Sequence, residues 1–180
     1  MIINLILNAE DYLTYQLYTA SVNKEARKKR LKSWFTVTGL SFLTALAFYV
    51  SGDMFLFYYA LFVGVAALFF YPLYQKVQYK KFYKKHVVKN NQYRFGKESL
   101  VTFKPDYIEI KDITYEGKLF TSEIEQINEI GTHYFIKFKV GESLIIPKQQ
   151  VNQTSFLTEI LSIFQNPNIV IQKQLGWRWK

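Results

Sequence analysis

The stretch that decides the fold covers residues 33–75 and reads SWFTVTGLSFLTALAFYV, then SGD, then MFLFYYALFVGVAALFFYPLYQ. It holds one charged side chain, Asp53, between apolar blocks of 17 residues (34–50) and 21 residues (54–74). As helices, the blocks would extend about 26 and 32 Å, close to the roughly 30 Å hydrocarbon core of a bilayer. Soluble helices are seldom apolar on every side over such a length. The stretch therefore predicts two membrane-spanning helices in a tight hairpin rather than a buried soluble hairpin.

The residues between and within the two blocks fit a close hairpin. Ser51-Gly52-Asp53 is a typical turn sequence, because Gly tolerates positive φ and Asp can bond its own backbone. Each block also carries small residues four apart, a spacing that lets helices approach closely. These packing residues are Ser41, Ala45, Ala60 and Gly64. We expect them to pack the hairpin against itself, with homo-oligomerisation through the same seam as the alternative.

The net charge of +9 is concentrated beside the hairpin. Residues 24–32 carry +5 and residues 76–97 carry +8, whereas residues 98–180 carry −1. Lys and Arg next to spanning helices are retained on the cytoplasmic side. The sequence therefore predicts a multi-pass cell-membrane protein with both termini in the cytoplasm. A nucleic-acid-binding protein would carry its positive charge on the folded domain, and this domain is nearly neutral, so we expect no nucleic-acid partner.

Basic residues beside a membrane attract anionic headgroups by about 1 kcal/mol each. The bilayer is therefore the first expected partner. The candidate lipid contacts are Arg27, Lys28, Lys29, Arg30, Lys32, Lys76, Lys80, Lys81, Lys84 and Lys85.

Four segments follow from these patterns. An N-terminal strand and amphipathic helix (1–33) lead into the transmembrane hairpin (34–74, with spans 34–50 and 54–74). A basic juxtamembrane connector (75–90) then leads into a cytoplasmic domain (91–180). The helix from residue 9 could continue into the first span or break near residues 21–23. The sequence leaves open whether 9–50 is one helix.

The cytoplasmic domain shows the period-two pattern of β-strands. Strands are expected at 99–103, 107–111, 113–115, 133–139 and 143–146, with β-like character at 169–171. Residues 122–130 are ambiguous between a strand and a helical turn. A helix is expected from residue 149 or 154 to 165, with one apolar face. The fold class is thus membrane α+β: a two-helix hairpin plus a small antiparallel, pleckstrin-homology-like (PH-like) β domain with a C-terminal helix.

Short motifs along most of the chain give it a family resemblance. They are Glu10-Asp11-Tyr12-Leu13, Tyr18, Tyr115-Glu116-Gly117, Ser122, Ile124, Ile127, Tyr134-Phe135-Ile136 and Ile145-Ile146-Pro147-Lys148. With the two spans, their order resembles the YcxB-like family of bacterial membrane proteins. The resemblance implies a two-span protein with a cytoplasmic PH-like domain, and it implies no established biochemical activity.

Residues for catalysis or metal binding are scarce. The chain has no Cys and two His. We expect a solvated or headgroup-facing role for His86 and a structural role for His133. We find no nucleophile paired with a base, no Gly-rich phosphate loop and no metal-ligand spacing. We therefore expect no enzyme activity, no catalytic, cofactor-binding or metal-binding residues, and no cofactor.

The last residues, Trp177, Arg178 and Trp179, combine indoles with a cation. This composition suits a membrane-interface anchor, and the alternative is a terminal strand that packs its Trp residues on the domain. For the whole chain, we expect a non-enzymatic membrane protein that presents its domain to a protein partner. The alternative hypothesis is immunity, that is, self-protection against a bacteriocin or toxin. A transporter or channel subunit is a third option, which the lack of charged groups within the spans disfavours.

Overall fold

The computed structural model of the protein describes residues 1–112, 116–164 and 169–179. These residues form two compact units. The helical unit contains Gln16–His86 together with Trp179, and the β unit contains Met1–Tyr15 and Val87–Arg178. The β unit thus includes the first residues of the chain, which the sequence pattern placed in a separate N-terminal segment.

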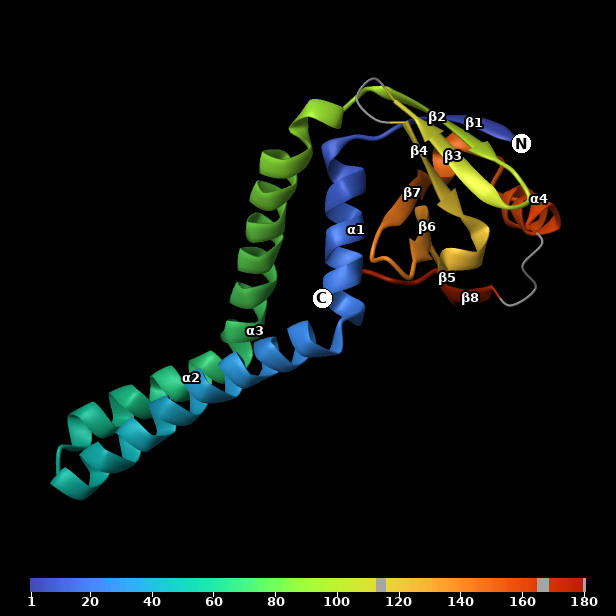
Figure 1. Cartoon of the computed structure of the whole chain (residues 1–180). Coiled ribbons are helices and arrows are strands. Elements are labelled where there is room, and N and C mark those ends of the chain that lie inside the picture. The colour runs from blue at the N-terminus through green and yellow to red at the C-terminus, as the bar shows by residue number, and fades with distance from the viewer. Residues whose placement is uncertain (113–115, 165–168, 180) are drawn as a thin grey trace. The chain divides into compact units, whose positions relative to one another are not determined.

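The helices and strands are labelled in Figure 1. In chain order they are β1 (Ile2–Ile6), α1 (Ala9–Val22), α2 (Lys24–Ser51), α3 (Met54–Asn91), β2 (Glu98–Phe103), β3 (Tyr107–Lys111), β4 (Glu116–Phe120), β5 (Ile124–Ile130), β6 (His133–Phe138), β7 (Ser143–Pro147), α4 (Phe156–Ile163) and β8 (Val170–Gln174). Short 3-10 turns cover η1 (Gln92–Arg94), η2 (Thr121–Glu123) and η3 (Lys148–Gln150). The chain therefore combines long helices with β-structure, as the sequence predicts.

Two long helices, α2 and α3, run side by side as a hairpin in the helical unit (Figure 1). Gly52 ends α2 with φ of 82°, and its N–H donates to the Tyr49 carbonyl at 3.2 Å. The Asp53 carboxylate then accepts the Leu56 N–H at 3.1 Å, which caps the start of α3. The expected turn at 51–53 thus ends one helix with Gly and begins the next with Asp.

A break separates α1 from α2 at Asn23. Its backbone is extended (φ −70°, ψ 115°) and its side chain accepts the Ala26 N–H at 3.1 Å. This is N-cap geometry, which satisfies a backbone donor that the start of a helix leaves free. The open question about residues 9–50 is therefore answered: they form two helices, not one.

Two four-stranded sheets build the β unit. Sheet A has the order β1-β2-β3-β4 and is antiparallel throughout. Sheet B has the order β7-β6-β5-β8, in which β8 joins β5 in parallel. In sheet A, Asn4 lies opposite Leu100, so a strand before the hairpin pairs with a strand after it (Figure 1, blue beside yellow-green). The sequence predicted the strand at the N-terminus but neither this pairing nor the parallel β8.

One apolar core lies between the two sheets and α4. Its buried members include Leu5 and Val101 of sheet A and Ile127 and Ile136 of sheet B, each at most 1% exposed. Phe156 of α4 touches both sheets: its ring centroid lies 6.0 Å from that of Phe103 and 5.1 Å from that of Tyr134. Edge-to-face and tilted ring contacts of this kind add to the burial of apolar area. The helix thus closes the end of the core.

The expected strands at 99–103, 107–111, 133–139 and 143–146 are confirmed within one or two residues. The strand expected at 113–115 lies outside the described residues. The ambiguous segment 122–130 is a 3-10 turn followed by β5. The predicted C-terminal helix is confirmed as α4, which is shorter than expected.

A buried ion pair lies in sheet B. Lys148 Nζ donates to Glu129 Oε1 at 2.7 Å, and both side chains are only about a tenth exposed (9% and 11%). Lys148 Nζ also lies 4.8 Å from the centre of the Tyr134 ring. Lys173 of β8 lies 3.8 Å from Glu129 Oε2. The pair therefore links β5 to the segment after β7, close to a ring of β6.

Removing one member of this pair should destabilise the protein strongly. We expect Lys148→Met to lower the free energy of unfolding by about 3–5 kcal/mol, because it leaves the Glu129 carboxylate buried without its close partner. The double variant Glu129→Leu/Lys148→Met should be less destabilised than the single variant. The matched control is Lys137→Met, whose partner Glu125 is exposed, and which should cost at most about 1 kcal/mol. Thermal unfolding of the purified full chain measures all three, and equal losses for Lys148→Met and Lys137→Met would contradict the assignment.

Candidate functional site

The open end of the hairpin is polar and strongly basic. We define the basic stem as Asn23 and residues 24–33 of α2 together with residues 75–86 of α3. All ten lipid-contact residues predicted from sequence lie on it, and nine are exposed whereas Arg30 is half-buried. Ser33 Oγ and Tyr71 OH, 2.8 Å apart, mark the level at which the stem meets the apolar part of the hairpin.

Arg30 is held between aromatic side chains. Its guanidinium carbon lies 4.9 Å from the ring centre of Trp179 and 5.9 Å from that of Tyr79. Its carbonyl accepts a hydrogen bond from Gln75 Nε2 at 3.2 Å, which ties α2 to α3. A guanidinium stacked on aromatic faces keeps N–H donors at its edge, in the fork that suits phosphate oxygens. Arg30 is therefore a half-buried cation with aromatic rings beside its guanidinium.

A cavity of about 260 Å³ opens beside Arg30. Its lining is Asn23, Glu25, Ala26, Lys29, Arg30, Tyr79 and Tyr83. Burial raises the pKa of the Tyr83 hydroxyl above its ordinary value of 10.0, although the Arg30 charge acts in the opposite direction. Tyr83 therefore stays a neutral hydrogen-bond donor at physiological pH. The cavity combines two cations and the Glu25 carboxylate with neutral hydroxyl and amide groups.

Small residues of the two apolar blocks are buried or closely approached within the hairpin. Ala45 is 2% exposed and Ala60 is 7% exposed. A Cβ placed on Gly64 would lie 3.4 Å from Ser41 Cβ, so the two helices approach closely at this level. The four predicted packing residues therefore lie where hairpin self-packing requires them.

The three residues predicted as an interface anchor, Trp177, Arg178 and Trp179, have different surroundings. Trp177 N–H donates to the Gln174 carbonyl at 2.9 Å, closing a turn after β8, and Arg178 is exposed. Trp179 belongs to the helical unit, where its indole Nε1 donates to the Lys76 carbonyl at 3.1 Å. Its ring meets Tyr83 edge-on at 6.5 Å. The sequence singled out Trp179 but gave no sign of its contact with Arg30.

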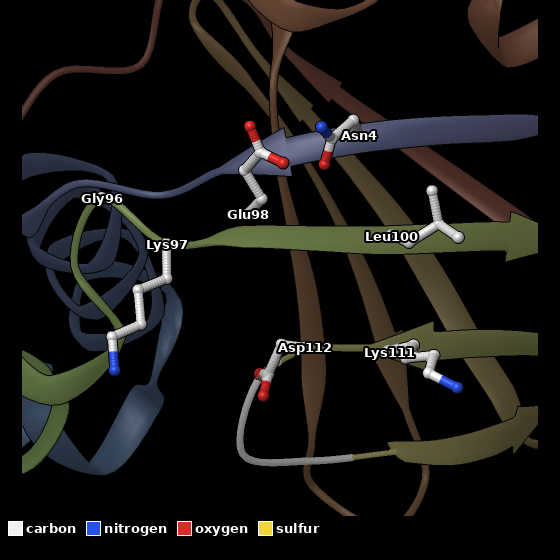
Figure 2. A pocket seen from close by; sticks show the side chains of 7 residues that line it. All are labelled: Asn4, Gly96, Lys97, Glu98, Leu100, Lys111 and Asp112. Carbon is white, nitrogen blue, oxygen red and sulfur yellow. The ribbon is translucent and has the colours of Figure 1, made fainter.

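A second cavity, of about 600 Å³, lies on the outer face of sheet A (Figure 2). Its lining is Asn4, Gly96, Lys97, Glu98, Leu100, Lys111 and Asp112. Asn4, Leu100 and Lys111 lie in register across β1, β2 and β3, so they form one row of this face. The same face carries the exposed apolar side chains of Ile2 and Phe120. Both signs of charge and isolated apolar groups therefore mix on this surface.

A polar contact fixes α1 on sheet B. Asp11 Oδ1 lies 2.9 Å from His133 Nε2, and Asp11 Oδ2 accepts the Asn8 N–H at 2.7 Å. Burial acts to raise the pKa of Asp11, but the hydrogen bonds from His133 and Asn8 and the charge of His133 outweigh it, so the pKa falls below its ordinary value of 3.8. His133 is buried and therefore has the structural role expected of it.

The described residues show no group of three or more His, Cys, Asp and Glu side chains that could hold a metal ion. Comparisons with protein-family models, with curated proteins and with solved structures find no match to this chain. The features that carry the functional argument are therefore the apolar hairpin, its basic stem and the outer face of sheet A.

The Asp11 contact gives a prediction for pH. Because its folded-state pKa is depressed, ionised Asp11 stabilises the protein above pH 3.8, and this contribution is lost as the pH falls through the lower folded-state value. We expect Asp11→Asn to be less stable than the wild type at pH 7, with the difference shrinking at acid pH. Melting curves of both proteins from pH 7 to 3 measure this. Glu142→Gln, at an exposed turn, is the control, and a pH-independent gap for Asp11→Asn would refute the assignment.

Proposed function

We propose that this protein is an integral membrane protein whose helical hairpin crosses the bilayer and whose β unit acts in the cytoplasm as a PH-like, non-enzymatic domain for a protein partner. The carrying observation is the uncovered apolar surface of α2 and α3. In each helix the most apolar 18-residue window is only 11% buried. Phe55 and Phe62, for example, are 79% and 71% exposed.

This uncovered surface favours lipid over water. A soluble monomer rarely exposes a contiguous apolar patch larger than a few hundred Å². A soluble hairpin of this composition would have to be covered by the rest of its own chain, and the described residues leave most of it bare. A bilayer covers both helices on all sides, and their internal hydrogen bonds satisfy the backbone there.

The charges on the hairpin support one orientation. The cations of the stem lie at the open end, whereas the closed end carries Asp53 and no Lys or Arg. Retention of Lys and Arg in the cytoplasm then places the turn outside and both termini inside.

The strand order of the β unit supports the PH-like proposal. In the described residues, strands β1 to β7 follow one another through the two sheets with antiparallel pairing, and α4 then closes the core. The helical hairpin is an insertion between the first and second of these strands. This layout is compatible with the resemblance to the YcxB-like family, which stays a prediction.

The outer face of sheet A is the surface that we propose for the partner. Exposed Leu100 and Phe120 lie among ion pairs such as Lys111–Glu116 (3.2 Å). Lys104 and Lys118 each lie 4.8 Å from the Tyr107 ring centre, so this face presents an ordered aromatic ring between two cations. Aromatic groups and paired charges suit a protein interface, whereas the nearly neutral domain is poorly suited to a strongly anionic surface.

Cysteine labelling tests the membrane topology cleanly, because the chain has no Cys of its own. We expect an impermeant maleimide to label Ser51→Cys on intact cells and Gln172→Cys only after lysis. Leu46→Cys is the decisive control: its side chain is 57% exposed, so a soluble hairpin would be labelled there and a hairpin in lipid would not. Labelling of Leu46→Cys in the native protein would overturn the proposal.

Photo-crosslinking tests the partner surface. A photoreactive residue at Leu100 should give a defined adduct with one protein in membranes of the source cell. The same residue at exposed Gln172 of β8 should not. Charge reversal by Lys111→Glu should reduce the adduct, whereas Lys139→Glu, outside sheet A, should leave it unchanged. Equal adducts from both positions, or no effect of Lys111→Glu, would reject this face.

A further inference from the structure

Arg30 differs from the other cations of the basic stem in both burial and contacts. It alone among the ten is half-buried, and the rings of Tyr79 and Trp179 lie beside its guanidinium. The exposed lysines can neutralise a charged surface without any fixed geometry. An arginine fixed by aromatic rings instead offers N–H donors in a set direction.

The charge around the cavity favours an anion. Lys29 and Arg30 line it, and Glu25 is its only acidic lining residue among those described. The Ala26 N–H at the start of α2 is not available to a ligand, because the Asn23 side chain already accepts it. The cationic side chains therefore set the sign of the potential.

The level of the cavity along the hairpin fits the headgroup layer of a bilayer. This inference rests on the membrane orientation proposed above. Arg30 lies three residues from Ser33, or about 4.5 Å along the helix axis. The headgroup layer of a bilayer is about 5–7 Å thick on each side of the hydrocarbon core. Arg30 thus lies at the level of the phosphates, and the rest of the cavity extends toward the cytoplasm.

We propose that this cavity binds the phosphodiester of one anionic phospholipid. Arg30 holds the phosphate oxygens in its fork, Lys29 adds a point charge, and the hydroxyls of Tyr79 and Tyr83 are available to the polar headgroup. The volume of about 260 Å³ lies just below the range of about 300–1,000 Å³ that holds drug-sized ligands. It suits a small headgroup rather than a large soluble cofactor.

The test uses the full-length protein in nanodiscs of phosphatidylcholine with a rising fraction of phosphatidylglycerol, with retained lipid measured by native mass spectrometry. Arg30→Gln should weaken phosphatidylglycerol retention about fivefold, the effect of one headgroup-contacting cation. Lys24→Gln removes the same charge from an exposed position of α2 that neither lines the cavity nor belongs to the ten candidate lipid contacts. Lys24 lies nine residues before Ser33, or about 13.5 Å along the helix axis, which is beyond the headgroup layer, so this variant should change retention less than about twofold. Glu25→Gln should increase retention, which loss of folding could not mimic.

The outcomes separate this inference from the membrane proposal. If Leu46→Cys is labelled in the native protein, the membrane proposal fails. If the hairpin is inserted but Arg30→Gln and Lys24→Gln lose lipid equally, or Glu25→Gln retains no more lipid than the wild type, only the headgroup site is overturned. Inorganic phosphate and glycerol 3-phosphate form a further arm in detergent, measured by the shift in thermal unfolding. Stabilisation by either that matches phosphatidylglycerol would assign the cavity to a soluble phosphate and overturn the lipid.

Discussion

Removal of apolar surface from water is the constraint on which this molecule depends. The β unit buries its apolar side chains internally, in one core formed by two sheets and α4. The helical unit does not, since large side chains such as Phe55 and Phe62 remain bare. Burial of an apolar side chain stabilises by roughly 1.5–3 kcal/mol. Exposure of many such side chains to water would therefore be strongly unfavourable. The proposed bilayer would cover this apolar surface without any further residues.

The β unit and the helical unit also differ in how their charged side chains are paired. In the β unit, carboxylates and amines pair with one another, from the exposed Lys137–Glu125 contact to the buried Lys148–Glu129 contact. On the stem, nine of the ten candidate lipid-contact cations face solvent, and the only acid within residues 24–32 and 76–97 is Glu25. An excess of one charge that its own fold does not compensate suits an external anionic surface. The bulk net charge therefore describes one part of the molecule and not the whole.

Local patterns in the sequence predicted the elements well and their long-range partners poorly. The turn at Gly52 and Asp53, both long helices and most strands follow from neighbours in the sequence. The sequence around Glu129 gives no sign that this carboxylate is buried, because its partner Lys148 lies 19 residues away. The contact between Asp11 and His133 spans 122 residues. The cavity at Arg30 could not be predicted either, since its lining combines the start of α2 with Tyr79 and Tyr83 of α3, which lie about 50 residues later in the sequence.

The pairing of β1 with β2 has a consequence for synthesis. A ribosome adds about 5–20 residues per second. Strand β1 is complete at Ile6, and its partner β2 is complete at Phe103, so the two are finished about 5–20 s apart. Both apolar helices are made during this interval. Sheet A can therefore form only after the hairpin has left the ribosome. The side-chain amide of Gln150 is made later still. It accepts the Ile6 N–H at 2.8 Å and donates to the Ile6 carbonyl at 2.7 Å. The order of the chain thus makes synthesis of the hairpin precede completion of the domain.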